Sequence, residues 1–367
     1  MREEEVQRGK LEDYRKEIDK LDDQIIDSLN KRGEVAQKIG TIKKLFNMEV
    51  HNPKRERELL DRLKKKSEIL NSISIEAIWK EILSTSKLLQ GFFHKVGYLG
   101  PKGTFTHQAA LDYFPKSGTE FKKFKSIGDI FDNIEKGVLD FGVIPIENSL
   151  HGTVRETLDL LIDKELLIYG EIELRIVQNL ISLKNSKLEN IKNIISHSQA
   201  FAQTKQWIKI NLPEANLIEA SSTAEAVRRI KENNNESYGA IGPEIASNIH
   251  GLKVLNSRIE DNPANFTRFL IISKKENEEK EGQIKTSLVF VTKHVPGALF
   301  QVLKIFADAK INLSKIESRP RRKGRWEYIF LMDFEGDKDD PEIRSIFNKL
   351  SESVIWYKIL GSYPMVK

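Results

Sequence analysis

The sequence predicts a multidomain protein with an all-α N-terminal part, a central α/β part and a C-terminal βαββαβ sandwich of the ferredoxin-like type. As far as Asn52, a long proline-free stretch repeats apolar residues at helical spacing. After Gly91, short apolar runs alternate with helical patterns, which is typical of α/β architecture. A polar, charge-dense linker at residues 275–284 precedes a strand-helix-strand-strand-helix-strand pattern. The predicted domains are residues 1–92, 95–274 and 285–367.

The composition is that of a soluble globular chain, and it excludes several classes of function. The 367 residues carry 59 basic and 54 acidic side chains with the two signs interspersed, so we expect no nucleic-acid partner. The lack of cysteine excludes disulfides and thiolate metal sites, and the histidines lack metal-binding spacing, so we expect no metal. Because we find neither a signal peptide nor an apolar run of about 18 residues, we predict a cytoplasmic protein with no membrane partner.

Three helices account for the N-terminal part. The first is an amphipathic helix of roughly thirty residues or more, a length that implies packing against a partner helix. The second starts at Asn52-Pro53, where a capping side chain precedes a proline at the first helical position. The third runs from about Ser74 to Gln90. Gly33 lies inside the first helix, where glycine costs about 1 kcal/mol relative to alanine.

Polar residues interrupt the inward-facing stripes of these helices. Arg32 and Lys43 are eleven residues apart and therefore share one helix face. Ser86 and Gln90 continue the inward stripe of the third helix. A solvated, salt-bridged bundle is one interpretation. However, polar groups at core-facing positions need partners, and two inward-facing cations favour an anionic ligand.

The first helix begins LEDYRKEIDKLDDQIIDSLNKR, and the second begins NPKRERELLDRL. Together with Lys43, this pattern resembles the all-helical chorismate mutase domain over residues 8–90. The resemblance implies a pericyclic rearrangement, which needs donors aimed where charge develops and needs no nucleophile. Three arginines would bind the two substrate carboxylates, Lys43 and Gln90 would donate to the breaking ether bond, and Glu56 would hold the ring hydroxyl. The implied site residues are Arg15, Arg32, Lys43, Arg55, Glu56, Ser86 and Gln90.

The position of Arg15 predicts an interlocked dimer. Arg15 precedes Lys43 by 28 residues, or about 42 Å along a straight helix. A substrate about the size of one ring cannot contact both side chains. We therefore expect Arg15 to serve a site built mainly by another subunit, which makes the helical part an obligate homodimer. The sequence leaves open whether the whole chain forms a dimer or a higher homo-oligomer.

In the central part, polar clusters stand where a predicted strand meets a helix, the edge at which open α/β sheets bind ligands. PKGTFTHQAA follows a strand at residues 96–100, PIENSLHGTV ends one at 141–146, and HSQAFAQ follows one at 194–196. NPANFTRF leads into an apolar run. Neither nucleotide-binding glycine motif (GxxxxGK followed by Ser or Thr, or GxGxxG) is present, and we expect no cofactor.

The central part resembles prephenate dehydratase over residues 96–274 in six ordered stretches: VGYLGPKGTFTHQAA, PIENSLHGTV, HSQAFAQ, ASSTAEA, GAIGPEIA and NPANFTRF. The resemblance implies two α/β lobes, like those of periplasmic ligand-binding proteins, with the site in the cleft between them. It also implies a reaction that removes water and carbon dioxide from prephenate to give phenylpyruvate. The implied site residues are Glu147, Asn148, Gln199, Ser222, Thr223, Thr267 and Arg268.

Two residues compete as the donor to the departing hydroxyl of that reaction. Thr267 is a poor acid, so it fits a positioned hydrogen-bond donor better than a full proton source. Glu147 is the nearest candidate for true acid work, provided that burial keeps it protonated. We favour Thr267 and hold Glu147 as the second candidate. Arg268 would hold a substrate carboxylate, and an ordinary ion pair within the protein is the alternative.

The C-terminal part contains VPGALFQVL and INLSKIESRP, and both resemble the ACT domain of phenylalanine-regulated enzymes. By this resemblance Gly297, Ala298 and Leu299 leave room for phenylalanine at a helix start, whose N-terminus suits a carboxylate. Oxygens across a subunit interface would receive the ammonium group. A tight Pro-Gly turn beside a salt-bridged strand is the alternative. The residues across the interface would be Asn312, Glu317 and Ser318.

The elements of this part follow from its apolar runs. A basic cluster around residues 319–325 is interpreted as a solvated hairpin turn. The predicted strands are residues 287–292, 311–319, 326–334 and 354–360, and the predicted helices are residues 297–310 and 341–351.

The three resemblances predict a bifunctional enzyme of phenylalanine biosynthesis, a chorismate mutase and prephenate dehydratase inhibited by L-phenylalanine. A mutase joined to a prephenate dehydrogenase would need a dinucleotide-binding motif, which is absent. An amino-acid-sensing binding protein without catalysis is the alternative on fold grounds alone. The inward-facing polar residues of the helices and the sequence TRF argue against it. The expected small-molecule partners are chorismate, prephenate and L-phenylalanine.

Overall fold

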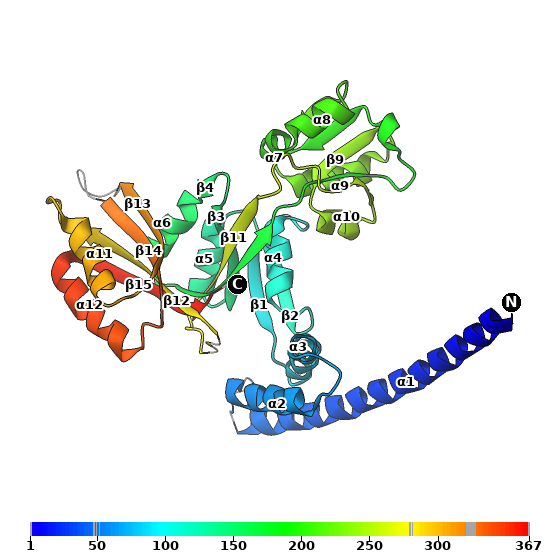
Figure 1. Ribbon diagram of the computed structural model, residues 1–367, viewed down its shortest axis with the longest axis horizontal. Coiled ribbons are helices and arrows are strands. Elements are labelled where there is room, and N and C mark those ends of the chain that lie inside the picture. The colour runs from blue at the N-terminus through cyan, green and yellow to red at the C-terminus, as the bar shows by residue number, and fades with distance from the viewer. Residues whose placement is uncertain are drawn as a thin grey trace. The chain divides into compact units, whose positions relative to one another are not determined.

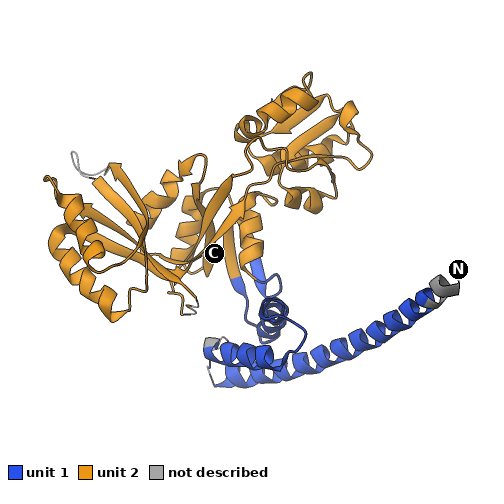
Figure 2. Ribbon diagram, in the orientation of Figure 1, with its two compact units in different colours: residues 1–94, 115–120 blue, residues 95–114, 121–367 orange. Residues whose placement is uncertain are grey.

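The structure is a computed structural model in which the chain forms two compact units (Figures 1 and 2). One unit comprises residues 1–94 and 115–120, and the other comprises residues 95–114 and 121–367. Among the described residues, no helix is both long and apolar enough to cross a membrane. The residues that the structure describes are 2–46, 48, 50, 52–278, 280, 282–320 and 328–365.

The first unit contains the three predicted helices. They are α1 (Arg2–Leu45), α2 (Pro53–Lys66) and α3 (Ser72–Leu89). α1 is one continuous helix of 44 residues. The Asn52 side chain accepts a hydrogen bond from Arg55 N at 3.0 Å and so caps α2, as predicted. Asn71 caps α3 in the same way, accepting from Ser74 N at 2.8 Å.

Two glycines of α1 allow α3 to approach it closely. A Cβ atom on Gly40 would lie 2.8 Å from Gln90 Cα, and one on Gly33 would lie 3.2 Å from Leu89 Cδ1. A larger side chain at Gly40 would therefore collide with the backbone of the segment that carries Gln90. This contact explains why a poor helix former occupies the helix interior.

The apolar stripe of α1 lies in solvent along most of its length. Leu11, Ile18 and Leu21 are 50%, 57% and 51% exposed. An amphipathic helix normally buries such a stripe against another element. In the single chain, the described residues of the other elements leave most of this stripe exposed. The exposed residues are Leu11, Tyr14, Ile18, Leu21, Ile25, Ile26, Val35, Ile39 and Ile42.

The second unit begins with an α/β lobe built on a mixed sheet. Its elements are β1 (His94–Leu99), α4 (Phe105–Tyr113), β2 (Thr119–Phe124), α5 (Ile127–Glu135), β3 (Phe141–Asn148), β4 (Gly152–Thr153), α6 (Arg155–Asp163), β5 (Leu167–Arg175) and β11 (Phe266–Ser273). The strand order is β2-β1-β3-β11-β5, with β4 paired to β3. β11 is antiparallel to both neighbours, so the returning chain places NPANFTRF beside the end of β3.

Alternate residues of β11 face opposite sides of this sheet. Phe269 and Ile271 pack in a buried cluster with α4, whereas Leu270 and Ile272 pack in a cluster with α5 and α6. By the same alternation, Thr267 and Arg268 project from opposite faces. The two adjacent residues of the TRF sequence therefore meet different surroundings.

A second α/β lobe is inserted between β5 and β11. Its strands follow the order β10-β6-β9-β7-β8, and β7 is parallel to both β8 and β9. This arrangement confirms the prediction of two α/β lobes in the central part. The elements are β6 (Asn179–Ser182), a 3₁₀ helix (Leu188–Asn190), β7 (Asn193–Ser196), α7 (Ser198–Gln203), α8 (Lys205–Asn211), β8 (Asn216–Glu219), α9 (Thr223–Asn233), β9 (Tyr238–Gly242), α10 (Glu244–His250) and β10 (Lys253–Asn256).

The C-terminal part has the predicted βαββαβ order. Its elements are β12 (Ile284–Thr292), α11 (Ala298–Asp308), β13 (Leu313–Pro320), β14 (Tyr328–Glu335), α12 (Pro341–Ser353) and β15 (Val354–Pro364), with strand order β13-β14-β12-β15. The predicted strand at residues 326–334 is found as β14, and its first two residues lie outside the described residues. Residues 321–325, which make up most of the predicted basic hairpin, also lie outside the described residues.

The C-terminal sheet shares a hydrophobic core with the first lobe. Val289, Leu331 and Leu360 are buried in the same cluster as Leu270 and Ile272 of β11. Residues before and after the polar linker predicted at residues 275–284 therefore belong to the same core. The C-terminal sheet therefore covers the face of the first lobe toward which Arg268 projects.

Candidate functional site

Three of the residues predicted for the helical part meet where α1 crosses α3. Arg32 Nη1 donates to Ser86 Oγ and, at 3.4 Å, to Ile82 O. Gln90 Nε2 donates to Ser86 O at 3.1 Å, and Gln90 Oε1 is buried with no hydrogen-bond partner in the part of the chain that the structure describes. Burial lowers the pKa of Arg32. This corner thus holds a partly desolvated cation beside a buried amide, an arrangement that suits an anionic, oxygen-rich ligand.

Glu56 is held by a residue that the sequence reading did not single out. Lys87 Nζ lies 3.1 Å from Glu56 Oε1, and both side chains are largely buried. Lys87 precedes Gln90 by three residues, a spacing that places the two on neighbouring positions of a helix surface and could have identified it. Lys43 lies near the end of α1 and donates from Nζ to Val50 O at 2.9 Å.

Arg15 and Arg55 do not join this cluster within one chain. Arg15 pairs with Glu12 at 3.4 Å and Arg55 with Glu58 at 3.5 Å, and all four side chains are exposed. Such surface pairs contribute little to stability, so both guanidinium groups can change partners at small cost. The continuity of α1 keeps Arg15 about 42 Å from Lys43 along the helix axis.

In the first lobe, Thr267 and Asn148 form a hydrogen-bonded pair. They are opposite each other in the β3–β11 ladder, and Asn148 Nδ2 donates to Thr267 Oγ1 at 2.8 Å. Asn148 Oδ1 in turn accepts from Leu150 N and His151 N, both at 3.1 Å. Because Thr267 Oγ1 already accepts a hydrogen bond, its own proton is free to be donated elsewhere. The pair therefore presents an oriented hydroxyl donor.

Asn265 is a third member of this group that the sequence reading missed. Its side chain is buried, and its Oδ1 accepts from Asn148 Nδ2 at 2.8 Å. Its Nδ2 is buried without a hydrogen-bond partner among the described residues. Asn265 precedes Thr267 by two residues, so strand alternation places both on one face. That spacing within NPANFTRF was the available signal.

The other predicted polar residues lie at helix starts of the second lobe. Gln199 lies in the first turn of α7, where its backbone N donates to His197 Nδ1 at 3.2 Å. Ser222 caps α9, accepting from Glu225 N at 3.1 Å, and Thr223 is the first residue of that helix. Helix starts carry free N–H groups that favour carboxylates. These residues are thus placed to receive an anion.

The loop after β1 brings the two lobes into contact beside α9. A Cβ atom on Gly103 would lie 2.9 Å from Ala246 Cβ and 3.7 Å from Ala224 Cβ. Gly103 also has a φ angle of +89°, which favours glycine. The PKGTF loop therefore approaches Ala246 of α10 more closely than a larger residue at position 103 would allow, and it lies in ordinary contact with Ala224 near the start of α9.

A buried histidine of α4, His107, accepts a hydrogen bond from this loop. Gly103 N donates to His107 Nδ1 at 3.2 Å, and the imidazole stacks on Tyr98 with ring centroids 4.5 Å apart. Burial, with a contribution from Lys102, lowers the pKa of His107 from 6.5 to about 4. Protonation would place a proton on the nitrogen that accepts from Gly103, so the native loop requires neutral His107.

We expect the stability of the protein to fall as pH falls from 6.5 toward 4, because the unfolded chain binds a proton that folded His107 excludes. The loss is at most about 3.5 kcal/mol, since each pKa unit corresponds to ~1.4 kcal/mol. Urea midpoints at pH 7 and pH 5 measure it. His107→Gln keeps an acceptor without a titrating ring and should show a smaller change between the two pH values. Equal changes in both proteins would contradict the assignment.

Arg268 projects from the opposite face of β11 into a buried charge cluster. Its Nη1 lies 2.9 Å from Asp333 Oδ2, and Lys285 Nζ lies 2.7 Å from Glu171 Oε2. Ser287 Oγ donates to Asp333 Oδ1 at 2.6 Å. The two cations and two anions balance, as a buried cluster requires. The ion pair that sequence analysis left as the alternative for Arg268 is therefore present.

Each charged group in this cluster stabilises the ionised form of its partners. Burial favours the neutral forms, but the carboxylate of Asp333, with Tyr363 and Glu171, outweighs it and raises the pKa of Arg268. Burial likewise favours protonated Asp333, but Arg268 and Lys285 outweigh it and lower the pKa of Asp333. Arg268 binding of a substrate carboxylate remains a prediction, and it would require the guanidinium to leave Asp333.

Glu147, the second candidate for proton donation, lies opposite Arg268 in the β3–β11 ladder. Its Oε2 accepts from Lys315 Nζ of β13 at 2.5 Å and lies 3.9 Å from Arg268 Nε. Its side chain is 35% exposed, so it has access to solvent. The carboxylate is thus held by a residue of the C-terminal part, on the face of the sheet that carries Arg268 and opposite to Thr267 and Asn148.

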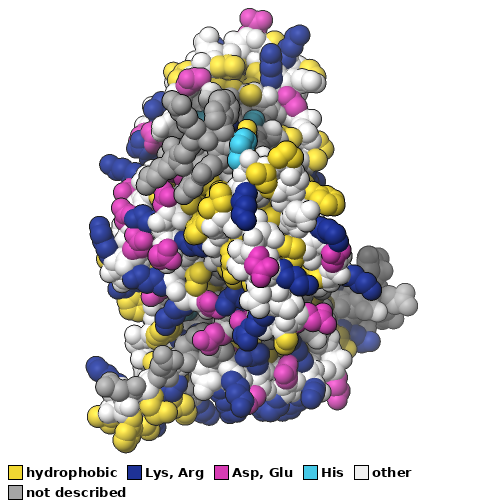
Figure 3. All heavy atoms as spheres, turned by 90° about the vertical axis from the view of Figure 1, so that its left-hand side faces the viewer, with side chains coloured by type: hydrophobic (Ala, Val, Ile, Leu, Met, Phe, Trp, Pro, Cys, Tyr) yellow, Lys and Arg dark blue, Asp and Glu magenta, His cyan; other side chains and the backbone are white. Residues whose placement is uncertain are grey.

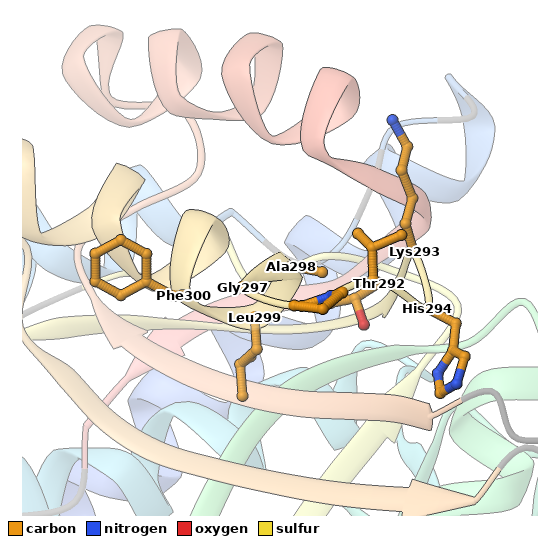
Figure 4. A pocket seen from close by; sticks show the side chains of 9 residues that line it. Thr292, Lys293, His294, Gly297, Ala298, Leu299 and Phe300 are labelled. Atoms are coloured by element: carbon orange, nitrogen blue, oxygen red, sulfur yellow. The ribbon is translucent and has the colours of Figure 1, made fainter.

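The predicted effector residues Gly297, Ala298 and Leu299 line a pocket of about 550 Å³ at the start of α11 (Figure 4). Gly297 has a φ angle of +81° and precedes the helix, and a Cβ atom there would meet nothing within 4 Å. In Figure 4, Leu299 and Phe300 extend in different directions from this turn. The lining consists of residues 292–300, with exposed Val295 and Phe300 among them.

The other three predicted effector residues do not line this pocket within one chain. Asn312 Nδ2 donates to Glu335 Oε1 at 2.7 Å. On β13, Ser318 is exposed, whereas the Glu317 carboxylate accepts from the Thr153 hydroxyl of the first lobe. Within one chain, the pocket therefore contains three of the six predicted effector residues, and their role remains a prediction.

The face of the molecule in Figure 3 intersperses Lys and Arg with Asp and Glu side chains. No extended area of one sign covers this face. A nucleic-acid-binding face would instead gather basic side chains. Among the described residues, no group of three or more His, Asp or Glu side chains could hold a metal ion.

Comparison with known proteins finds three family matches in order along the chain. Residues 14–91 match the family description "Chorismate mutase type II", and residues 96–277 match "Prephenate dehydratase". Residues 286–352 match "ACT domain". The three matches follow the three parts described above.

Individual proteins give the same result. A bifunctional chorismate mutase/prephenate dehydratase of Aquifex aeolicus is 40% identical over 359 residues, covering 96% of this chain and 98% of the relative. A prephenate dehydratase from Arthrobacter aurescens, solved in complex with L-Phe, is 32% identical with a TM-score of 0.67, covering 74% and 90% of the two chains. The prephenate dehydratase structure from Staphylococcus aureus is 28% identical with a TM-score of 0.65, covering 73% and 99%.

Proposed function

The chain belongs to the family of bifunctional chorismate mutase/prephenate dehydratases, and we propose that it performs the two reactions at separate sites. The helical unit would rearrange chorismate to prephenate, and the first and second lobes would convert prephenate to phenylpyruvate, water and carbon dioxide. The observation that carries this proposal is the presence of two distinct polar groups in one chain. One is Arg32–Ser86–Gln90 on the crossing helices, and the other is Thr267–Asn148 where β3 ends and β11 begins.

For the rearrangement, the helical unit needs to bind a dianion in a compact conformation and to stabilise charge on the ether oxygen. Arg32 is already oriented by Ser86 and Ile82. We assign Arg15, Arg32 and Arg55 to the carboxylates, and Lys43 and Gln90 to the ether oxygen. Glu56, oriented by Lys87, is assigned to the ring hydroxyl. No covalent step is required of any of these side chains.

For the dehydration, ring aromatisation supplies the driving force, so the protein mainly holds the dianion and assists the departing hydroxyl. The Thr267 hydroxyl is oriented by Asn148, which in turn touches the buried Asn265. We assign the donor role to Thr267 and keep Glu147 as the alternative acid. The helix starts that carry Gln199, Ser222 and Thr223 suit the substrate carboxylates.

We assign the pocket at Gly297, Ala298 and Leu299 to L-phenylalanine. The start of α11 offers backbone N–H groups to a carboxylate, and the absence of a side chain at Gly297 leaves room beside them. The oxygens for the ammonium group would come from Asn312, Glu317 and Ser318 of a second chain. This arrangement makes effector binding dependent on a homo-oligomer.

The exposed apolar stripe of α1 supports an interlocked homodimer of the helical unit. Docking a second α1 would bury that stripe and bring Arg15 of one chain near the Arg32 site of the other. We expect the full-length protein to sediment as a dimer or larger, and Leu21→Glu with Ile25→Glu to lower both self-association and mutase activity. A natural protein that sediments as a fully active monomer would contradict this proposal.

The test of the proposed function is a coupled assay on the purified protein. Chorismate is supplied, and phenylpyruvate is followed by its absorbance in base, with and without L-phenylalanine. We expect phenylpyruvate to appear and L-phenylalanine to suppress it. If L-phenylalanine binds but neither chorismate nor prephenate is consumed at high protein concentration, the protein is an amino-acid sensor instead.

A further inference from the structure

One face of β13 is turned toward the first lobe. Burial alternates along this strand, and Lys315, Glu317 and Arg319 are, after Leu313, its partly buried residues. The alternate residues Ile316 and Ser318 are exposed. Strand period two places the first three on one face, at successive positions along the strand. The strand that carries predicted effector residues thus also contacts the lobe that carries the dehydratase residues.

Three side-chain contacts and one backbone pairing link four residues of this contact into a ring. Glu147 and Thr153 are cross-strand partners in the β3–β4 ladder. Lys315 Nζ lies 2.5 Å from Glu147 Oε2 and 3.5 Å from Glu317 Oε2. The Thr153 hydroxyl donates to Glu317 Oε2 and closes the ring. Lys315 is therefore the one side chain of the ring that contacts both a carboxylate of the dehydratase site and a carboxylate of the effector site.

The side chain of Lys315 is largely buried, and this burial strengthens its contacts with the two carboxylates. Its side chain is 13% exposed, so water screens its charge less than at an open surface. An ammonium group has three donors, and here two carboxylates share it. Glu147 is the nearer of the two carboxylates, and a ligand that takes Glu317 away leaves Glu147 as the only one of the pair that holds Lys315. The position of Glu147 then depends on the partner of Glu317.

We propose that Lys315 is a positioning residue that orients Glu147 and links the effector site to the dehydratase site. The inference rests on the proposed function, which assigns Glu147 to the dehydratase site and Glu317 to the phenylalanine site. The ammonium group of phenylalanine competes with Lys315 and Thr153 for the Glu317 carboxylate. Lys315 is then paired with Glu147 alone and holds its carboxylate toward β13, away from the substrate. Inhibition follows because Glu147 is then fixed on the face of the sheet opposite to Thr267 and Asn148.

The test compares Lys315→Met with Lys315→Arg in the full-length protein. The methionine variant keeps the length of the side chain and removes its charge, whereas the arginine variant keeps the charge. Dehydratase kcat and KM for prephenate are measured without and with saturating phenylalanine, and phenylalanine binding is measured separately by calorimetry. Phenylalanine binding reports that the C-terminal part is folded, and chorismate mutase activity reports the same for the helical unit.

We expect Lys315→Met to bind phenylalanine while the factor by which phenylalanine lowers kcat/KM drops about tenfold, the usual scale of such coupling. Its effector-free kcat should also change, because Glu147 loses its anchor, and Lys315→Arg should restore both properties in part. A Lys315→Met variant that is inhibited as strongly as the natural protein overturns the inference. A natural protein that forms no phenylpyruvate overturns the proposed function instead.

Arg319 provides a matched control on the same face of β13. Its Nη1 donates to Asp159 Oδ1 at 2.6 Å, and its side chain is 16% exposed, so it resembles Lys315 in burial and in joining the same two parts. It contacts neither Glu147 nor Glu317 in this ring. Arg319→Met should therefore keep phenylalanine inhibition. Equal loss of inhibition in both methionine variants would mean that β13 only holds the C-terminal part against the first lobe. That result overturns the specific role of Lys315.

A second variant keeps the inference testable if Lys315→Met does not fold. Thr153→Val removes the hydroxyl that holds Glu317 and leaves the Lys315–Glu147 contact in place. Glu317 then meets less competition, so we expect phenylalanine to inhibit at a concentration several-fold lower, with effector-free kcat/KM within about twofold of the natural value. An unchanged inhibitory concentration would count against the ring as the link between the sites.

Discussion

Replacing Thr267 by alanine is expected to lower dehydratase kcat by about 100- to 1,000-fold, the range seen when one oriented donor to a developing anion is removed. The reason is the pairing with Asn148, whose Nδ2 donates to Thr267 Oγ1 at 2.8 Å and leaves the threonine proton for the departing hydroxyl. Rates with supplied prephenate measure the effect. The change lies in the second unit, so mutase activity should persist.

Thr267→Ser is the control, because it keeps the hydroxyl and loses only a methyl group. We expect it to retain most of the dehydratase activity. If Thr267→Ala remains within about threefold of the natural rate, Thr267 is not the donor, and Glu147 becomes the leading candidate. If both variants lose mutase and dehydratase activity together, Thr267 is needed for folding rather than for the reaction.

Replacing Asp333 by alanine is expected to destabilise the second unit by about 3–5 kcal/mol, the usual cost of removing one partner from a buried ion pair. Asp333 is fully buried, and its loss leaves the cations Arg268 and Lys285 with Glu171 as their one buried carboxylate, because Glu147 is 35% exposed and is held by Lys315. Urea denaturation measures the change in midpoint. Since Arg268 follows Thr267 on β11, dehydratase activity should fall before mutase activity as urea rises.

Asp308 is the matched control for this prediction. It is also an aspartate of the C-terminal part, and it pairs with Lys304, but both side chains are exposed. Asp308→Ala should leave the midpoint nearly unchanged, because surface ion pairs contribute little. The double change Asp333→Leu with Arg268→Met should recover much of the lost stability by removing the unpaired cation. Equal midpoints for Asp333→Ala and Asp308→Ala would contradict the account of the cluster.

The architecture of each part could be predicted because its signals are local. Apolar spacing and the capping residues Asn52 and Ser222 fix where helices run, and the βαββαβ order follows from successive apolar runs. The exposed stripe on α1 was likewise implicit in a long amphipathic helix that needs a partner. None of these inferences requires knowledge of contacts between distant segments.

The surroundings of the site residues could not be predicted in the same way. Lys315 and Glu147 are 168 positions apart, and Arg268 and Asp333 are 65 apart, so no local pattern connects them. The polar composition of residues 275–284 indicates a linker, but it does not reveal that the core continues across it. Strand alternation alone would have separated Thr267 from Arg268 and joined Asn265 to Thr267. It would not have identified their partners.

The central claim is that one chain carries two independent sites, and it is tested most directly by measuring both activities in Arg32→Ala and Thr267→Ala. Chorismate loss and phenylpyruvate formation from supplied prephenate are followed on the same preparations. The account predicts that Arg32→Ala loses mutase activity by at least about 100-fold and keeps dehydratase activity, and that Thr267→Ala shows the reverse. It would be contradicted if either variant, still folded by circular dichroism, lost both activities together.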